Sequence, residues 1–553
     1  MKHKLGLTGH HVLIGYTLMG LLLLIDGCFL FYKLGTVPHI FIDESALANE
    51  VQSLADYGQD THGYSWPLYF QGPFGGQSIL YSFFVVPVVK LFGFSIAAFR
   101  APFVIITLLL ILSISLLVRK LAQHFAASLL VELTLITAPW LFISTRWVLD
   151  CNIAPIMVIF GIEGLMLAFR AQTKKWRLSW LLLGTAFIAI AAYGYSVAWL
   201  YLPVFLLILA IYTFVKKLLT WQELGMALVL TVLLVLPLVI FAIDTNIYHI
   251  TTAKHFLWWT LPPYSNNRNV SFIDFHAPNI VDIAIANLGA GIQQYIKGSD
   301  GLAWNSLAPY GVIYPALLLL LPVGIFAYHQ ADSRLNIFRN LVVISLVSFV
   351  PLMLIVKPNY NHWNFINLPL MILVGLGFWY SYQFIRVWLV RAAIVLLPVV
   401  LGLLFVHAYY GSANMPTYFT AGVQNNYLQA SYQNIDQINQ FIKQHPNRYL
   451  YVSQLSSTFT YFKTVAIVSP AEDAKISDTP AGFQPKLKYG ALRDLSQFKT
   501  IRKRDYALLP YANVNSAPIG TTFTFQNMEQ DKFKIVKVTP YLSAPNAIVQ
   551  RIK

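Results

Sequence analysis

The chain is dominated by apolar segments that are long enough to cross a lipid bilayer. A helix needs about 20 apolar residues to span roughly 30 Å of hydrocarbon. Charged residues make up 11% of the 553 residues, against about 25% in soluble domains. A soluble globular fold is therefore excluded, and we expect an all-α polytopic membrane bundle of 11 transmembrane helices. The predicted spans lie near 11–33, 97–118, 122–142, 153–172, 179–197, 199–215, 224–243, 309–328, 340–356, 364–383 and 392–410.

The net charge of +15 does not indicate nucleic acid as a partner, because the charges lie in clusters between apolar segments. With a cytoplasmic N-terminus, the inner ends of the predicted spans carry fourteen Lys and Arg and two acids. The outer loops then carry ten acids and eight basic residues. This is the positive-inside pattern of a multi-pass protein of the cell membrane. It requires segment 78–93, which is short and contains Pro87 and Lys90, to lie along the outer surface.

The predicted topology divides the chain into a membrane domain, 1–410, and an extracytoplasmic part, 411–553. In the latter, β-rich runs such as RYLYVSQL (448–455) alternate with a helical segment near 425–444, which predicts a small soluble α/β domain. The first outer loop, about 34–96, should contain two surface-lying helices, one over 43–57 and one over 76–92. A second large outer loop covers 244–308.

Acidic residues occur in two loops that the predicted topology places at the outer face of the membrane. The first loop begins with FIDESALANEVQSLADYGQD, in which Asp43 and Glu44 precede apolar residues at helical spacing. Such a pair can simply cap a helix and complement its dipole, but carboxylates beside the membrane are also functional candidates. In STRWVLDCNIAP (144–155), Arg146 and Asp150 are four residues apart and could form a weak surface ion pair. Both loops nonetheless direct carboxylates to the same membrane face.

Basic and aromatic residues at this face are candidates for substrate binding. An anionic phosphate leaving group needs positive charge nearby. Arg146 is the best-placed candidate, and Lys357 and His362 in KPNYNHWNF (357–365) are others. For His362 a solvated loop histidine is the plainer interpretation. Tyr193 and Tyr195 either belong to an interfacial aromatic belt or stack on a sugar ring, and the sequence leaves both open.

Three acids within predicted spans support an alternative function. Asp26, Glu132 and Glu163 are costly in hydrocarbon and should face the interior of the bundle. They would suit a transporter or lipid flippase with a path through the middle of the membrane. A scaffold function carried by residues 411–553 is a second alternative.

The order of these motifs resembles the GT-C superfamily of membrane glycosyltransferases. The nearest resemblance is to the branch of protein O-mannosyltransferases and of the aminoarabinose transferases that modify lipid A. It covers about residues 10–215 through FIDESALANEVQSLADYG, PLYF, AAFRAPFVI and STRWVLDCNIAP, and continues weakly to NYNHWNFINLPLMILVGLG.

The resemblance implies transfer of a hexosyl or pentosyl group from a polyprenyl-phosphate donor to an acceptor on the outer face. The acceptor would be a protein, an envelope polymer or a lipid. By position, Asp43 corresponds to the catalytic base, with Glu44 adjacent and Asp150 in the second loop. Relatives place a basic residue before the proline that opens the second surface helix, whereas GYSWPLYFQGPFGGQS (63–78) has none. Arg100, Arg146 or a residue of 244–308 would have to replace it.

No cofactor is expected. An Asp base acting in a single displacement would invert the configuration of the sugar. The two outer acid sites could bind a divalent metal, but the sequence does not demand one. The two cysteines, Cys28 and Cys151, indicate neither a disulfide framework nor a metal site.

Overall fold

The protein is mostly helical. The computed structural model describes residues 9–38, 42–71, 76–263, 272–302, 304–327, 333–411, 441, 444–445, 448, 450–453, 489–492, 503–510, 516–524, 532–541 and 544–553. Within these residues, nine helical segments are long and apolar enough to cross a membrane. They are α1 (Gly9–Phe31), α4 (Ile96–Ala122), η1 (Asp150–Asn152) with α7 (Ile153–Arg170), α8 (Lys174–Ile190) with η2 (Ala191–Tyr193), α9 (Ala198–Val215), α10 (Trp221–Asn246), α13 (Ser333–Val347) with α14 (Val350–Met353), α15 (Asn364–Phe384) and α16 (Trp388–Tyr410).

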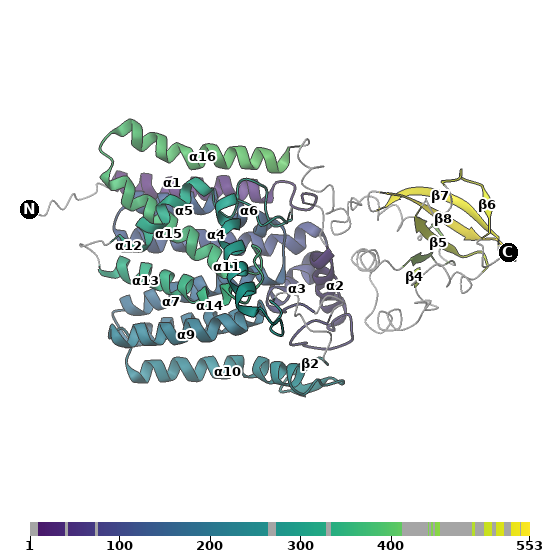
Figure 1. Cartoon of the computed structure of the whole chain (residues 1–553), viewed down its shortest axis with the longest axis horizontal. Helices are drawn as coiled ribbons and strands as arrows, with labels where there is room; N and C mark the ends of the chain where they lie inside the picture. Colours follow the sequence, from purple (N-terminus) through teal and green to yellow (C-terminus); the bar gives the residue numbers. More distant parts are fainter. Residues whose placement is uncertain are drawn as a thin grey trace, which may run out of the picture.

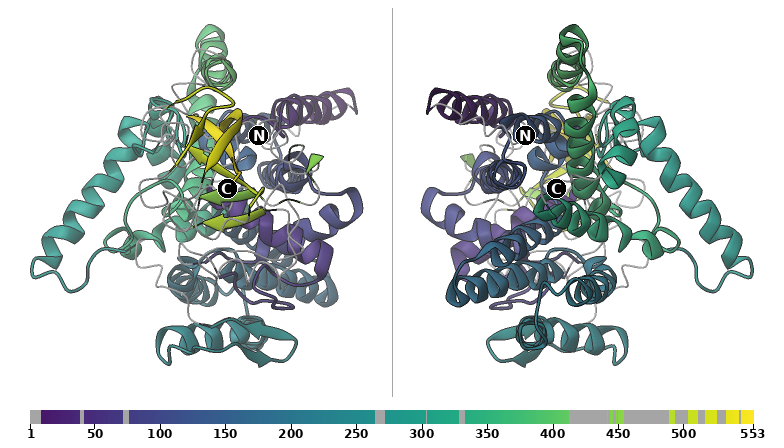
Figure 2. Two further views of the ribbon diagram at one scale, coloured as in Figure 1. Left: turned by 90° about the vertical axis from the view of Figure 1, so that its right-hand side faces the viewer. Right: turned by 90° about the vertical axis from the view of Figure 1, so that its left-hand side faces the viewer.

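The spanning helices form one bundle with α15 inside it. Nearly all side chains of α15 from Asn364 to Tyr380 are buried. In contrast, α10 and α16 lie at opposite edges of the bundle and leave many apolar side chains exposed, as lipid-facing helices do (Figures 1 and 2). Gly377 of α15 lies so close to the backbone at Leu320, in the helical segment over Pro315–Phe326, that a side chain there would collide with it. Small residues allow such close helix packing in membranes.

Two further apolar helices meet at a bend, and together they are long and apolar enough to count as a tenth segment. α5 (Phe125–Ile136) and α6 (Pro139–Arg146) are inclined by 57°. Proline disfavours helical backbone at the residue before it, and Ala138 is accordingly extended, with φ −72° and ψ 117°. The Thr137 carbonyl at the break accepts a hydrogen bond from the Tyr314 hydroxyl at 2.7 Å. This tertiary contact stabilises the bend.

The predicted span over 309–328 is not a continuous transmembrane helix in the described part of the chain. It consists of a 3₁₀ helix, η4 (Pro315–Leu320), followed by the short helix α12 (Leu321–Phe326). Together these reach only about 21 Å, which is less than the hydrocarbon thickness. Pro315 and Pro322 remove backbone donors from this segment. The count of 11 predicted spans therefore exceeds the nine or ten that the described residues contain.

Connecting elements gather at one end of the bundle. α2 (Ile42–Tyr57) and α3 (Leu80–Phe92) correspond to the two helices predicted in the first outer loop. The hairpin β1 (Lys254–Phe256) and β2 (Trp259–Leu261) and helix α11 (Ile280–Lys297) come from the second loop. Figure 1 shows these elements at the end opposite to the start of α1, with the C-terminal strands beyond them. Elements of the first and second predicted outer loops thus lie at the same end of the bundle.

The C-terminal part contains a six-stranded mixed sheet in the order β4-β3-β5-β8-β7-β6. Strand β3 is parallel to β4 and β5, and the other neighbours are antiparallel. The strands are β3 (Leu450–Ser453), β4 (Tyr489–Leu492), β5 (Tyr506–Pro510), β6 (Thr522–Phe523), β7 (Phe533–Tyr541) and β8 (Ala544–Arg551). Most of the helical segment predicted near 425–444 lies outside the described residues, so the α/β class of this part stays a prediction.

Candidate active site

Glu44 lies at the start of α2 in a buried ion pair with Arg100 of α4. Arg100 Nε and Nη2 donate to the two carboxylate oxygens of Glu44, each at 2.6 Å. Both side chains are fully buried. The backbone N–H of Val148 also donates to Glu44 Oε1, at 3.2 Å. Because bidentate, charge-assisted hydrogen bonds are strong and directional, this pair fixes the start of α2 against α4 and against the segment that precedes η1.

Two consecutive residues, Gln77 and Ser78, connect Asp43 to Asp150. The Gln77 side-chain amide donates to the backbone carbonyl of Asp43 at 2.8 Å. The backbone N–H of Ser78 donates to Asp150 Oδ2 at 2.7 Å. Asp43, Glu44 and Asp150, which come from two loops far apart in the sequence, are thereby brought together at the end of the bundle that carries the connecting elements.

The three acids differ in how far they are enclosed. Glu44 has no exposed surface and Asp150 is 3% exposed, whereas Asp43 is partly exposed. Asp43 is therefore the acid of this group that a substrate can reach most easily. The sequence did not indicate Gln77 or Ser78, because both contacts join residues that are at least 34 positions apart.

Arg146, predicted to contact a lipid phosphate, is instead inside the protein. Its Nη1 donates to the carbonyls of Phe29 and Leu30, and its Nη2 donates to those of Tyr32 and Val37, at 2.8 and 2.7 Å. The last turn of a helix leaves carbonyl oxygens without partners, so Arg146 caps the end of α1 from another helix. With no exposed surface, its guanidinium does not lie where a lipid phosphate could contact it.

Arg100, the other arginine predicted to replace the missing basic residue, is also fully buried. Besides its ion pair with Glu44, its Nη1 donates to the carbonyls of Leu34 and Pro38, both at 2.9 Å. Arg100 and Arg146 thus bind the same short segment that follows α1. This placement corrects the expected phosphate role of both residues, because their donors are directed at protein oxygens.

We predict that Arg146→Lys lowers the free energy of unfolding by about 1–3 kcal/mol, because one ammonium group has three donors for four buried carbonyls. The Michaelis constant for a lipid-phosphate donor should stay within about twofold. Chemical denaturation in detergent and donor titration measure the two quantities. If Arg146→Lys instead raised the donor Michaelis constant strongly and left the free energy of unfolding unchanged, Arg146 would bind the donor phosphate after all.

Lys357 and His362 lie in the loop between α14 and α15, which its asparagines hold in place. Asn359 Oδ1 accepts from the backbone N–H of His362 at 2.7 Å, and His362 Nδ1 lies 3.0 Å from the carbonyl oxygen of Lys357. Asn364 Nδ2 donates to the carbonyl of Cys151 at 2.8 Å, one residue after the acid of η1. Lys357 is exposed. The start of α15 therefore lies beside the acids. The loop that precedes it exposes the Lys357 ammonium group to solvent.

A partly buried acid that the sequence did not single out fixes the neighbouring loop. Asp300 accepts hydrogen bonds from the backbone N–H groups of Tyr360 and Leu302, at 2.9 and 3.1 Å, and from the side chains of Asn305 and Ser306, at 2.8 and 2.9 Å. Burial raises the pKa of the Asp300 carboxyl, and these four donors oppose the shift. Asp300 thus ties the second outer loop to the loop that contains Lys357.

The tyrosines that were candidates for sugar stacking are packed inside the protein. Tyr193 donates to the carbonyl of Leu234 at 2.6 Å, and its ring stacks on Trp259 with centroids 6.2 Å apart. Tyr195 is 4% exposed. Neither ring presents an open face, so both tyrosines are packed inside the protein rather than exposed to a sugar or to the membrane interface.

Metal-binding groups are not found at these acids. In the described ranges, no three His, Cys, Asp or Glu side chains gather so as to hold a metal ion. That the chemistry needs no metal stays a prediction.

Comparison with known proteins rests on structure alone. No protein-family model matches the chain. No curated protein sequence matches it either. Among solved structures, ArnT from Cupriavidus metallidurans in the apo state superposes with a TM-score of 0.55 at 12% identity, over 96% of this chain and 97% of ArnT. The same protein bound to undecaprenyl phosphate gives identical values.

This chain has the fold of ArnT. The archaeal oligosaccharyltransferase AglB from Archaeoglobus fulgidus, in complex with an inhibitory peptide and a dolichol-phosphate, aligns with a TM-score of 0.49 at 11% identity, over 91% of this chain and 70% of AglB. Within this fold, the three acids lie at the end of the bundle where α2 and α3 connect α1 to α4.

Proposed function

We propose that this protein is a membrane glycosyltransferase that uses a polyprenyl-phosphate sugar as donor. The observation that carries the proposal is the convergence of Asp43 and Asp150 through Gln77 and Ser78 in a chain with the fold of ArnT. ArnT has a structure with undecaprenyl phosphate bound. The group transferred is a hexosyl or pentosyl group, and the acceptor is a hydroxyl group of a protein, an envelope polymer or a lipid.

In this proposal, Asp43 is the general base. A hydroxyl group is a poor nucleophile at neutral pH and needs a base within hydrogen-bond distance of its proton. The Asp43 carboxylate takes this proton while the acceptor oxygen attacks the anomeric carbon from the face opposite to the phosphate. A new C–O bond to the acceptor forms and the bond to the phosphate oxygen breaks, so the configuration inverts. The polyprenyl phosphate leaves as an anion and needs no acid.

The buried acids position this base rather than touch the substrate. The Glu44–Arg100 pair holds the first turn of α2, and with it the backbone of Asp43. Asp150 fixes Ser78, whose neighbour Gln77 binds the Asp43 carbonyl. Enzymes need such support because small displacements of a reacting group strongly reduce its effect.

Positive charge for the leaving phosphate would come from the loop before α15. Lys357 is exposed and His362 is half-buried, and Asn364 joins the start of α15 to Cys151 beside Asp150. Cationic groups aimed at a leaving phosphate stabilise the charge that develops there. The orientation proposed is a cytoplasmic N-terminus, with the acids and residues 411–553 at the outer face.

The transporter alternative depends on the acids within the bundle. Asp26, Glu132 and Glu163 are all buried. Glu163 accepts a hydrogen bond from Ser113 of α4 at 3.0 Å, which indicates a helix-packing role.

We predict that the purified protein transfers sugar from a radiolabelled polyprenyl-phosphate donor to an envelope extract in detergent solution. The triple variant Asp26→Asn, Glu132→Gln, Glu163→Gln should retain this activity within about threefold, since neutral side chains of the same shape are less costly in a membrane interior. Detergent micelles have no two compartments, so transport cannot contribute to the signal. Absence of transfer in detergent, together with activity in intact membranes that is lost in the triple variant, would favour the transporter.

A further inference from the structure

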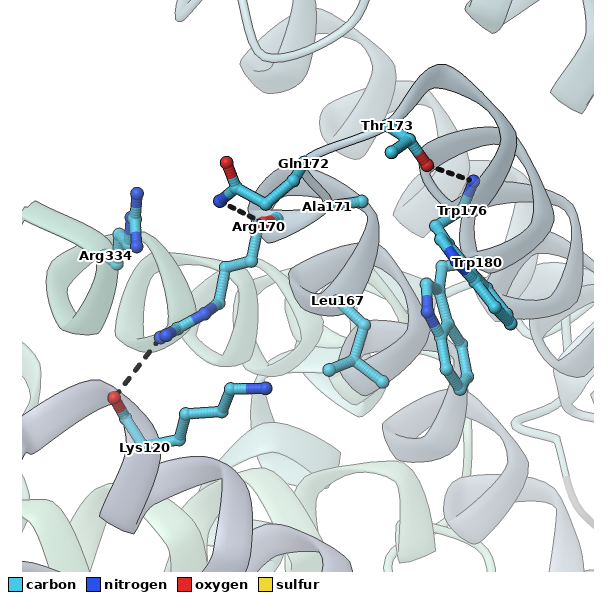
Figure 3. Close-up of a pocket in the computed structure, with 9 residues that line it drawn as sticks. All are labelled: Lys120, Leu167, Arg170, Ala171, Gln172, Thr173, Trp176, Trp180 and Arg334. Carbon is cyan, nitrogen blue, oxygen red and sulfur yellow. Dashed lines mark hydrogen bonds between the residues drawn. The ribbon is translucent and has the colours of Figure 1, made fainter.

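Figure 3 shows the residues that line a pocket of about 380 Å³. The pocket lies at the end of the bundle away from α2 and α3, and therefore opposite to the three acids (Figure 1). It is formed where α4 and α7 end and where α8 and α13 begin. Its lining residues are Lys120, Leu167, Arg170, Ala171, Gln172, Thr173, Trp176, Trp180 and Arg334. The volume falls in the range of ordinary small-molecule sites.

The pocket is strongly cationic. Lys120, Arg170 and Arg334 line it, and none of the nine lining residues is acidic. The Lys120 ammonium has no hydrogen-bond partner within the residues that the structure describes. Of the two acids that the sequence places at this end, Glu223 pairs with Arg177 at 2.5 Å, and Asp332 lies outside the described residues.

Aromatic side chains place the pocket at the membrane surface. Trp176, which is 58% exposed, and Trp180 lie on the first turns of α8. Figure 3 shows the cations on one side of the pocket and the two indole rings on the other. Trp is enriched where hydrocarbon meets the lipid headgroups. A ligand in this pocket would therefore meet positive charge and an interfacial apolar wall at once.

We propose that this pocket binds the phosphate headgroup of an anionic membrane lipid. Basic pockets between membrane helices are known to hold such headgroups, and Arg and Lys recognise phosphate through charge-assisted hydrogen bonds. The indole rings and Leu167 would contact the glycerol backbone and the first part of the acyl chains. The site is distinct from the proposed donor site, because the pocket and Asp43 lie at opposite ends of the bundle, and it does not depend on the proposed function.

Native mass spectrometry of the full-length protein in neutral detergent, titrated with phosphatidylglycerol, tests the proposal. Each cation near a headgroup strengthens binding about fivefold. We therefore expect Lys120→Gln to weaken binding of the first lipid about fivefold, and Lys120→Gln, Arg170→Gln, Arg334→Gln together to weaken it roughly 100-fold. Phosphatidylcholine should not show this first site.

The matched control removes three exposed cations from the same end but outside the pocket, as Lys216→Gln, Lys217→Gln, Arg386→Gln. This variant should keep the affinity within about threefold. An equal loss of lipid affinity in both triple variants would show that general surface charge, and not this pocket, determines binding. That result would overturn the proposal. Displacement of the lipid by an equal concentration of glycerol phosphate would also overturn it, because the pocket would then prefer a soluble phosphate. The single Lys120→Gln variant keeps the test valid if the triple variant misfolds.

Discussion

Asp43→Asn is expected to lower the rate of sugar transfer by a factor of roughly 100 to 10,000. The amide keeps the size of the carboxylate but cannot accept the proton of the acceptor hydroxyl, and a positioned general base contributes a factor of this order. The contact of the Asp43 backbone carbonyl with Gln77 does not involve the side chain, so the first turn of α2 should keep its place. The turnover number should fall while the donor Michaelis constant stays within a few-fold.

The assay compares membranes with equal amounts of protein and a radiolabelled polyprenyl-phosphate sugar. Asp56→Asn is a matched control, because it removes the same charge from the exposed end of the same helix, and it should retain full activity. Near-normal transfer by Asp43→Asn would remove Asp43 from the chemistry. Equal losses in both variants would point to a general effect of charge on α2.

Most of the membrane helices could be predicted from the sequence, because the hydrocarbon of a bilayer restricts the length of a spanning segment and the placement of charged residues. Apolar length located most of the spans, and the distribution of Lys and Arg placed the loops that contain Asp43 and Asp150 at the same end. The prediction of one continuous helix was wrong where prolines interrupt an apolar run. Within the predicted span over 309–328, Pro315 and Pro322 each lie at the start of a short helix, and the predicted span over 122–142 bends at Pro139.

Side-chain roles were harder to predict, because the partners are distant in the sequence. Arg146 and Asp150 are four residues apart and suggested a surface ion pair, yet Arg146 binds carbonyls after α1 and Asp150 binds the backbone of Ser78. No periodicity or spacing encodes contacts of this kind. The same holds for Asp300, whose donor at Tyr360 is 60 residues away. Sequence thus identified the acids of the candidate site but not the groups that hold them.

The ion pair of Glu44 with Arg100 gives the second large expected effect, on stability. Glu44→Gln should lower the free energy of unfolding by about 3–5 kcal/mol, because it leaves a fully buried guanidinium without its counter-charge. The double variant Glu44→Gln, Arg100→Gln should cost less than the sum of the single variants, since it leaves no unpaired charge inside the protein. Chemical denaturation of the purified protein in detergent measures all three values.

The pair of Arg177 with Glu223 is a matched control, because its geometry is similar but its side chains are 28% and 14% exposed. Glu223→Gln should cost only about 1 kcal/mol, since water screens a partly exposed pair and Gln can still complete the capping box with Thr220. Equal costs at the two pairs would contradict a special role for burial. If Glu44→Gln instead left stability unchanged and abolished transfer, Glu44 would take part in the reaction itself, as its place beside Asp43 first suggested.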